Sequence, residues 1–313
     1  MDNIISRVSR ELIKQELNNN TFVRRTNNGN KEIFILDFHN SPNTLQEIGR
    51  LREITFREAG GGTGKPLDID EYDTSETPFK QLIVWDPIEE EIVGGYRFLE
   101  GYNILKSGFE KPKTPTAHLF NLSDQFKRDY FPFTFELGRS FVQPLYQPNI
   151  NLRKGMYSLD NLWDGLGELI VEQPDMRYFF GKVTMYPDFN PVACDLIHHF
   201  LSLYFKDQEQ LVYPTEVLNF KTDKANFADT FSGNDYPADF KILIQSVRNF
   251  KENIPPLMNA YMNLTKSMKY FGASVNTRFG NVEESGILIQ ISDIYEAKKE
   301  RHINHINKTR ISI

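Results

Sequence analysis

The stretch FTFELGRSFVQPLY, residues 133–146, decides the expected fold. Apolar and polar residues alternate over its first half, as in a half-buried strand, with the apolar ones at Phe133, Phe135 and Leu137. Gly138 then interrupts the strand, and a glycine in that position indicates a bulge whose extra residue resets the alternation. We therefore expect Glu136 and Arg139 to point to the same side of one sheet. A purely structural ion pair is the alternative interpretation, because burying an unpaired charge is costly.

The composition predicts a globular chain that works in a reducing compartment. The 313 residues are 40% hydrophobic and 25% charged, and no apolar run approaches the roughly 20 residues that a membrane-spanning helix needs. A lone cysteine, Cys194, excludes an internal disulfide. The net charge of −6 argues against nonspecific nucleic-acid binding. We expect a cytoplasmic protein with a single domain over residues 1–313.

Apolar periodicity predicts most of the secondary structure. Strands are expected at 32–38, 80–86, 91–100, 133–142, 177–185 and 286–294, and helices at 4–17, 44–58, 158–170, 192–205, 240–249 and 257–268. Ser158 and Asn190 are the expected N-caps of two of these helices. Antiparallel pairs followed by a strand-helix-strand-helix unit indicate an α+β fold with a mixed sheet flanked by helices. A helical extension over about 1–30 and a polar insertion over about 206–256 complete the chain.

A basic tail ends the chain at residues 298–313. One interpretation is a solvated helix end followed by a frayed terminus. The other is an electrostatic contact with an acidic partner or with a membrane surface, which would place the protein peripherally at the inner membrane face.

Two loop motifs are similar to known ligand-binding motifs. AGGGTGKP (59–66) departs from the phosphate-binding signature G-x-x-x-x-G-K-[ST] at Ala59 and Pro66, and it follows a helix instead of a strand, so we reject that interpretation. LDIDEYD (67–73) lacks the glycine and the final glutamate of a calcium loop. A solvated acidic loop and a site for a cation or an amine both remain open for it.

No metal site and no covalent nucleophile are predicted. His198 and His199 lie mid-helix without an H-E-x-x-H motif. Cys194 lies one helical turn before His198, which is compatible with a thiol nucleophile, but the apolar surroundings favour a small buried cysteine. Ser140 lacks the second glycine of a nucleophile elbow.

A set of motifs extends over most of the chain, namely E-L-G-R-S-F-V-x-P (136–144), R-Y-F-F-G-K-V-T-M (177–185), N-T-L-Q-E-I-G-R-L-R-E-I-T-F-R-E-A-G-G-G-T-G-K (43–65), D-I-D-E-Y-D (68–73), Q-L-I-V-W-D (81–86), G-G-Y-R-F (94–98) and P-P-L-M-N-A-Y (255–261). Through these motifs the sequence resembles the GNAT-fold acyltransferases that take acyl chains from acyl carrier protein. The chain looks most like the hemolysin-like ornithine-lipid and glycine-lipid N-acyltransferases, and 43–65 looks particularly like the glycine-lipid enzymes of Bacteroidetes. The order R-x-x-x-F, D-x-x-D, G-x-x-R, E-x-x-R is a more distant likeness to acyl-homoserine-lactone synthases.

The resemblance implies a GNAT-like sheet whose central strands splay after the bulge, with the phosphopantetheine arm of the donor in the gap. The usual phosphate loop of the fold, [QR]-x-x-G-x-[GA], is absent. The corresponding stretch N-L-R-K-G-M-Y-S (151–158) keeps only Arg153, Lys154 and Gly155. This departure favours acyl carrier protein over coenzyme A as the donor. No cofactor is expected, because the phosphopantetheine arrives on the carrier protein.

The implied reaction moves a 3-hydroxyacyl chain to the amine of an amino acid, with glycine favoured, in aminolipid synthesis. The resemblance assigns Glu136 and Arg139 to catalysis, with Glu136 as the base acting through water. Four further residues are assigned to the acceptor, namely Arg52, Asp70, Asp73 and Arg97. The carrier protein and its arm are assigned to Ser140, Phe141, Val142, Arg153, Lys154 and Gly155. The alternatives are a lactone-synthase-like enzyme and a non-catalytic protein that binds acyl chains or membranes on the same scaffold.

Overall fold

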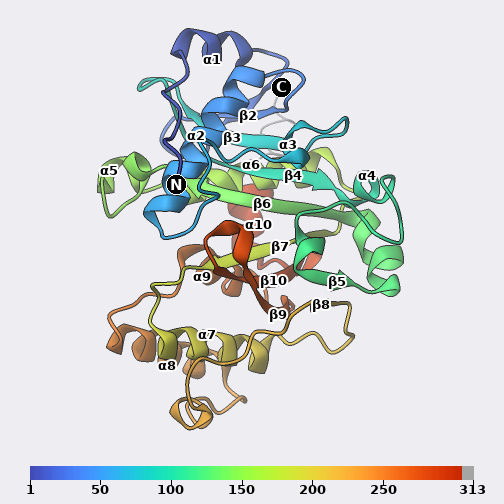
Figure 1. The fold of residues 1–313 in the computed structure, drawn as a ribbon, viewed down its shortest axis with the longest axis vertical. Helices are drawn as coiled ribbons and strands as arrows, with labels where there is room; N and C mark the ends of the chain where they lie inside the picture. The colour runs from blue at the N-terminus through green and yellow to red at the C-terminus, as the bar shows by residue number, and fades with distance from the viewer. Residues whose placement is uncertain (305–313) are drawn as a thin grey trace. The chain divides into compact units, whose positions relative to one another are not determined.

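The computed structural model describes residues 1–304, which divide into two compact units interleaved in the sequence (Figure 1). Unit 1 contains Met1–Ile104, Phe135–Met176 and the described residues from Glu296 onward. Unit 2 contains Leu105–Thr134 and Arg177–Tyr295. The single domain expected over 1–313 stays a prediction.

Unit 1 is built on antiparallel strands in the order β1-β2-β3-β4-β6. Their bounds are β1 (Phe22–Arg25), β2 (Glu32–Leu36), β3 (Lys80–Asp86), β4 (Glu91–Glu100) and β6 (Thr134–Val142). The strands predicted at 80–86 and 91–100 are confirmed with the same bounds. β1 was not predicted, because the four residues FVRR are too few to show an alternation.

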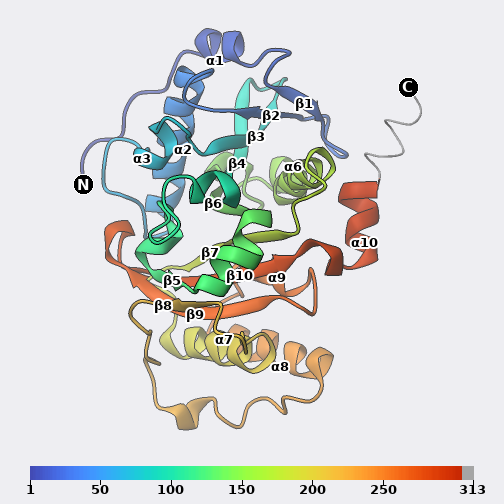
Figure 2. The same ribbon diagram turned by 90° about the vertical axis from the view of Figure 1, so that its right-hand side faces the viewer.

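Two long helices lie on opposite faces of this sheet, as Figure 2 shows. The helices of unit 1 are α1 (Arg10–Glu16), α2 (Pro42–Glu58), α3 (Glu71–Thr74), α4 (Gly101–Leu105), α5 (Leu152–Gly155), α6 (Ser158–Glu172) and α10 (Glu296–Lys299). On β3, the side chain of Gln81 accepts a hydrogen bond from Arg52 of α2. The next residue, Leu82, lies so close to Gly165 of α6 that a Cβ there would come within 2.5 Å of it. Successive side chains of a strand point to opposite faces, so α2 and α6 sandwich β3.

The ends of several helices differ from the sequence prediction. The first helix begins at Arg10 rather than at residue 4. Glu16, at its end, accepts from the backbone N–H of Thr44 at 2.7 Å and so holds the first turn of α2. Ser158 is the first helical residue of α6 and not its N-cap, and its hydroxyl donates to the carbonyl of Tyr146 at 2.9 Å.

The described part of the basic tail is attached to α6. Arg301 pairs with Asp160 at 2.5 Å, and His302 lies 2.8 Å from an oxygen of Asp164. Residues 305–313 of the predicted tail lie outside the described residues, so the proposed membrane or partner contact stays a prediction. Within residues 1–304, no helix combines the length and the apolar character that crossing a membrane requires.

Unit 2 has its own antiparallel strands in the order β7-β10-β9, and a second pair, β5 with β8. The bounds are β5 (Phe120–Leu122), β7 (Tyr178–Met185), β8 (Val212–Pro214), β9 (Lys269–Asn276) and β10 (Val282–Gln290). Its helices are α7 (Pro191–Tyr204), α8 (Tyr236–Asn249) and α9 (Pro256–Met262). Figures 1 and 2 both show α7 and α8 side by side next to β9. The predicted insertion at 206–256 supplies β8 and α8.

In unit 2 one predicted cap is confirmed, whereas β9 and the three-residue strands β5 and β8 were not predicted. Asn190 caps α7 as predicted, because its side chain accepts from Val192 and Ala193 at 3.0 and 3.2 Å. Residues 269–276 form β9, although no strand was predicted there. Gly272, with φ of 87°, lies at a register shift against β10, and this bulge breaks the alternation that would have identified the strand. The α+β class is nevertheless confirmed, whereas the splay of the central strands stays a prediction.

Candidate active site

β6 carries a bulge immediately after Gly138. Gly138 lies opposite Arg97 of β4, and Phe141 lies opposite Gly95, so three steps on β6 match two on β4. The bulge predicted from the glycine is therefore confirmed. The residue in the unusual conformation is Arg139, whose φ of 50° is in the left-handed region that non-glycine residues rarely adopt.

The two glycines of G-G-Y-R-F allow the bulged strand to approach β4. A Cβ on Gly94 would lie far inside van der Waals contact with the carbonyl oxygen of Phe141. A Cβ on Gly95 would lie 2.7 Å from the carbonyl oxygen of Leu82, on the other neighbouring strand. Larger residues would push the strands apart at the point where Arg139 is positioned.

Glu136 and Arg139 lie on one side of the sheet, as predicted. Glu136 is opposite Leu99, and Gly138 is opposite Arg97, so the register places Glu136 on the face that carries Arg97. Arg139 reaches the same face, since its Nε lies 2.7 Å from Oδ2 of Asp68 and its Nη2 lies 3.9 Å from Oδ2 of Asp70, which also binds Arg97. Glu136 itself is 1% exposed.

Around this face the structure assembles a charge cluster from three arginines and three aspartates. Its members are Arg52, Arg97, Arg139, Asp68, Asp70 and Asp73. Nη1 of Arg97 contacts Asp70 at 2.8 Å and Asp73 at 3.0 Å. Nη1 of Arg52 contacts Asp73 at 3.3 Å. Four of the six are the predicted acceptor residues and one is the predicted catalytic arginine, although their roles stay predictions.

Exposure divides the charge cluster into an inner framework and an outer edge. The side chains of Arg52 and Asp73 are 0% exposed, and that of Arg97 is 2% exposed. The side chains of Asp70 and Arg139 keep 22% and 17% of their surface. Solvent reaches the cluster through Asp70 and Arg139.

The acidic motif D-I-D-E-Y-D is ordered by its own carboxylates. Asp70 is the N-cap of α3 and accepts from the backbone N–H of Tyr72 at 3.0 Å, while Asp73 accepts from the N–H of Asp70 at 3.2 Å. Asp68 and Asp73 are 1% and 0% exposed. The interpretation of this stretch as a solvated loop is therefore wrong for these two residues.

The sequence analysis assigned no site role to two residues of this region, namely Tyr72 and Gln81. Gln81 donates to Asp73 at 3.0 Å and accepts from Arg52, so it joins α2 to the acidic motif. The only local signal was a polar residue directly before the apolar run LIVW, and the position of Gln81 opposite Arg97 depends on the pairing of β3 with β4.

Burial and neighbouring charges shift the pKa values of Asp70, Arg97 and Tyr72, in directions that favour an ionised Asp70, an ionised Arg97 and a neutral Tyr72. Burial acts to raise the pKa of Asp70, but the Arg97 guanidinium outweighs it and holds that pKa below its usual value. Burial acts to lower the pKa of Arg97, but Asp73 and Asp70 raise it above the usual value. Burial, followed by the charges of Glu71, Asp70 and Glu136, raises the pKa of Tyr72 to about 12, so this phenol remains a hydrogen-bond donor.

The residues predicted to receive the carrier protein form α5, a separate short helix, rather than the start of α6. Arg153 is exposed, while Lys154 pairs with Glu89 at 2.8 Å. Gly155 is buried, and a Cβ on it would lie 2.5 Å from the backbone nitrogen of Pro148. Three apolar side chains are more than half exposed around them, at Ile150, Leu152 and Met156. Of the residues predicted to contact the donor's arm, Phe141 is buried, and Ser140 and Val142 are half-buried.

The glycine-rich loop does not offer its backbone to a phosphate, because Glu53 occupies it. The carboxylate of Glu53 accepts from the backbone N–H groups of Thr63 at 3.0 Å and Gly64 at 2.8 Å. Arg57, one turn further along α2, contacts the same carboxylate at 2.7 Å. The rejection of the phosphate-binding motif is supported by these contacts.

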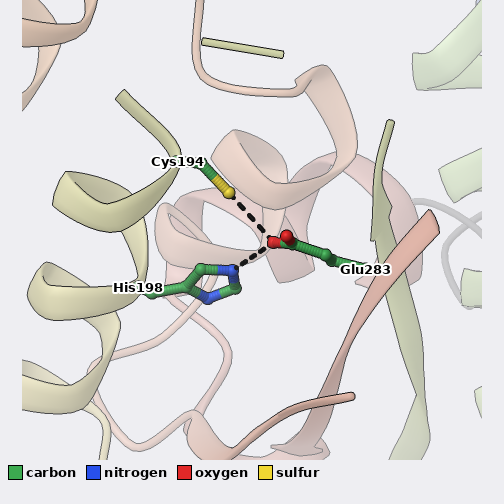
Figure 3. Close-up of side chains that lie close together, drawn as sticks. All are labelled: Cys194, His198 and Glu283. Atoms are coloured by element: carbon green, nitrogen blue, oxygen red, sulfur yellow. Dashed lines mark hydrogen bonds and ion pairs between the residues drawn. The ribbon is translucent and has the colours of Figure 1, made fainter. Parts of the chain in front are cut away.

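In unit 2, Cys194 and His198 of α7 meet Glu283 of β10, as Figure 3 shows. Sγ of Cys194 donates to Oε2 of Glu283 at 3.0 Å, and Nε2 of His198 lies 3.1 Å from the same oxygen. Burial and the charge of Glu283 raise the pKa of the Cys194 thiol. The prediction of a small buried cysteine is confirmed, because Cys194 is 1% exposed.

Comparison with known proteins decides the family. The chain is 48% identical over 308 residues to the Glycine N(alpha)-acyltransferase of Phocaeicola vulgatus, a match that covers 98% of this chain and 94% of that protein. It is 50% identical over 303 residues to the Glycine N(alpha)-acyltransferase of Bacteroides thetaiotaomicron, covering 97% of this chain and 90% of that protein. The chain belongs to the glycine N(alpha)-acyltransferase family. It is therefore an acyltransferase, and the resemblance stated from the sequence is confirmed.

Two further similarities concern the fold of this family member. The Acetyltransferase (GNAT) domain family matches residues 51–153, which include the charge cluster and the bulge. Two solved structures of a CoA-dependent acyl-homoserine lactone synthase, BjaI, one with MTA and one with SAM and isopentyl-CoA, have TM-scores of 0.40 and 0.41 at 12% identity. Each covers 88% of this chain and 90% of that chain. The GNAT-like fold class is as predicted, and the activity of BjaI is not carried over.

Proposed function

We propose that this acyltransferase moves a long acyl chain, preferably 3-hydroxylated, from acyl carrier protein to the amine of glycine. The observation that carries the proposal is the identity of 48% and 50%, over nearly the whole chain, to two proteins named Glycine N(alpha)-acyltransferase. The lipid character of the product and the carrier-bound donor rest on the sequence resemblance and on the degenerate phosphate loop at 151–158.

Glycine offers one ammonium and one carboxylate, and the outer edge of the charge cluster offers the two complementary charges. The Arg139 guanidinium is suited to bind the carboxylate through two parallel hydrogen bonds. Asp70, which stays ionised beside Arg97, attracts the ammonium. The buried residues Arg52, Arg97 and Asp73 then act as a framework that fixes Asp70 in position.

The reaction requires a neutral amine, and Glu136 is the proposed base. Glu136 takes a proton from the ammonium through a water molecule, and the nitrogen lone pair attacks the thioester carbon. The tetrahedral intermediate collapses with cleavage of the C–S bond, and the second proton lost by the nitrogen passes to the leaving sulfur, so the product is an amide and the carrier leaves as a thiol. Because Glu136 and Arg139 lie on one face, an acceptor held by its carboxylate at Arg139 would present its amine on the same side as the base.

The donor is proposed to dock at α5. Acyl carrier protein is acidic, and Arg153 presents an exposed positive charge there. The exposed side chains of Ile150, Leu152 and Met156 add the apolar area that a protein partner covers better than a free nucleotide does. The arm would then pass Ser140, Phe141 and Val142, which follow the bulge.

Mass spectrometry of the lipids of a heterologous host, before and after expression, tests the acceptor. The expected product is N-acylglycine, and it should be absent with Glu136→Gln but present with Glu71→Gln, a matched change of an exposed carboxylate in α3. An N-acyl homoserine lactone would favour the lactone-synthase alternative instead. A host with no new acylated amine would contradict the enzymatic proposal and leave the acyl-binding alternative.

The purified protein tests the donor. Matched acyl chains on carrier protein and on coenzyme A are supplied with glycine, and we expect turnover with the carrier-bound donor alone. Equal turnover with both donors would refute the donor assignment while leaving the acceptor assignment intact.

A further inference from the structure

Outside the active site, unit 2 contains a buried group of three side chains whose atoms are all metal ligands in other proteins. Cys194 and His198 are one helical turn apart on α7, so they lie on one face of that helix. Glu283 reaches them from β10 (Figure 3). The three ligand atoms lie within 4.8 Å of one another, and the three residues are between 1% and 5% exposed.

We propose that Cys194, His198 and Glu283 bind a thiophilic divalent cation, with zinc as the best fit. Thiolate, imidazole and carboxylate are the three ligand types that zinc uses, and they leave one tetrahedral position for water. Magnesium and calcium prefer oxygen ligands alone, so the thiol and the imidazole disfavour them.

The imidazole nitrogen and the carboxylate oxygen that would not bind the metal already have other partners. Nδ1 of His198 lies 2.9 Å from the hydroxyl of Tyr270, and Oε1 of Glu283 lies 2.6 Å from Nζ of Lys221. Such outer contacts orient metal ligands in proteins, because they leave Nε2 of the imidazole and one carboxylate oxygen free to bind. Here both outer contacts fall on the atoms turned away from the common point.

The distances from Glu283 to the other two ligand atoms are close to those of a zinc site. Tetrahedral zinc with ordinary bond lengths separates its sulfur and oxygen ligands by about 3.5 Å and its nitrogen and oxygen ligands by about 3.3 Å. The corresponding distances here are 3.0 and 3.1 Å, which suit hydrogen bonds to Glu283. For these two pairs the separation therefore has to grow by only roughly 0.2–0.5 Å, and the thiol proton leaves to solvent on binding.

Titration of the EDTA-treated full-length protein with Co²⁺ tests the proposal. A near-ultraviolet thiolate-to-cobalt band should saturate at about one ion per chain and disappear when Zn²⁺ is added, but persist with Mg²⁺. Cys194 is the only cysteine in the sequence, so the band can arise only from this thiol. Zn²⁺ should also slow alkylation of the thiol by iodoacetamide. The absence of the band at millimolar Co²⁺, together with unchanged alkylation in Zn²⁺, would overturn the proposal in favour of a hydrogen-bonded group.

Matched variants separate the site from incidental binding. Glu283→Gln and His198→Asn should each weaken Co²⁺ affinity about 10- to 100-fold or more, whereas His199→Asn, one residue along the same helix, should leave it unchanged. Circular dichroism checks that each variant is folded. If a variant fails to fold, the titration of the wild-type protein still tests the proposal. Equal affinity in His198→Asn and His199→Asn would place the cation elsewhere and refute the assignment.

Discussion

Asp73→Asn tests whether paired charge holds the inner framework of the charge cluster. The substitution keeps the size of the side chain, and its carbonyl oxygen can still accept from Gln81 as Oδ1 of Asp73 does at 3.0 Å. It removes the carboxylate that Arg97 contacts at 3.0 Å and Arg52 contacts at 3.3 Å. Arg97 retains Asp70, whereas Arg52 keeps only a neutral amide among these contacts.

The geometry sets the expected magnitude. At an effective dielectric constant of about 20, each guanidinium–carboxylate contact at these distances is worth roughly 5 kcal/mol of Coulomb attraction. Part of that attraction only offsets the desolvation of the buried charges. Removal of one partner from a buried pair usually costs about 3–5 kcal/mol, and we expect Asp73→Asn to lower the free energy of unfolding of unit 1 by that amount. Burial already lowers the pKa of Arg52, so this guanidinium depends strongly on Asp73.

Urea unfolding followed by tryptophan fluorescence measures the effect. The two tryptophans, Trp85 and Trp163, both belong to unit 1, so the signal reports the unit that contains the substitution. Glu71→Gln changes an exposed carboxylate of the same short helix and should alter the free energy of unfolding by no more than about 0.5 kcal/mol. A loss below about 1 kcal/mol for Asp73→Asn would show that packing, and not charge pairing, maintains this region.

Three further predictions concern catalysis, pH and docking. Glu136→Gln should lower kcat about 10²- to 10⁴-fold and leave the free energy of unfolding unchanged. If the variant keeps nearly the full kcat at every pH, Glu136 has a structural role and is not the base. Burial acts to raise the pKa of Glu53, but hydrogen bonds from Thr63 and Arg57 hold it below 4.5, so Glu53 contributes stability that is present above pH 4.5 and lost as the pH falls further. The free energies of unfolding of the wild type and of Glu53→Gln should therefore converge as the pH is lowered into the acid range. A difference between the two that stays constant with pH would contradict this. Reversal of the charges of Arg153 and Lys154 should weaken affinity for acyl carrier protein and flatten its salt dependence, whereas identical salt slopes would move the docking site elsewhere.

Local patterns predicted the features that depend on neighbours in sequence. The strands at 80–86 and 91–100 were found to the residue because apolar runs are bounded by a turn at Pro87. The bulge followed from one glycine, Gly138, and it correctly placed Glu136 and Arg139 on one side. The alternation failed at β9, where Gly272 inserts a bulge inside the strand itself.

Features that depend on strand register and on helix packing could not be predicted from the sequence. The role of Gln81 arises only when β3 pairs with β4 and α2 lies above them. Asp68 could not be distinguished from a solvated carboxylate until Arg139 was placed beside it. Glu283 is 89 residues from Cys194 in the sequence, and no periodicity connects them.

The anion next to the glycine-rich loop is the carboxylate of Glu53, which is part of the chain itself. Gly60, Gly62 and Gly64 all have positive φ, the conformation that turns successive N–H groups toward an anion. In a nucleotide-binding protein the anion is exchanged with solvent, and its occupancy depends on concentration. A tethered carboxylate stays next to the loop whatever the concentration of phosphate in solution, and here it accepts from the N–H groups of Thr63 and Gly64. In this protein the glycine-rich stretch therefore serves to attach the loop to α2 through Glu53.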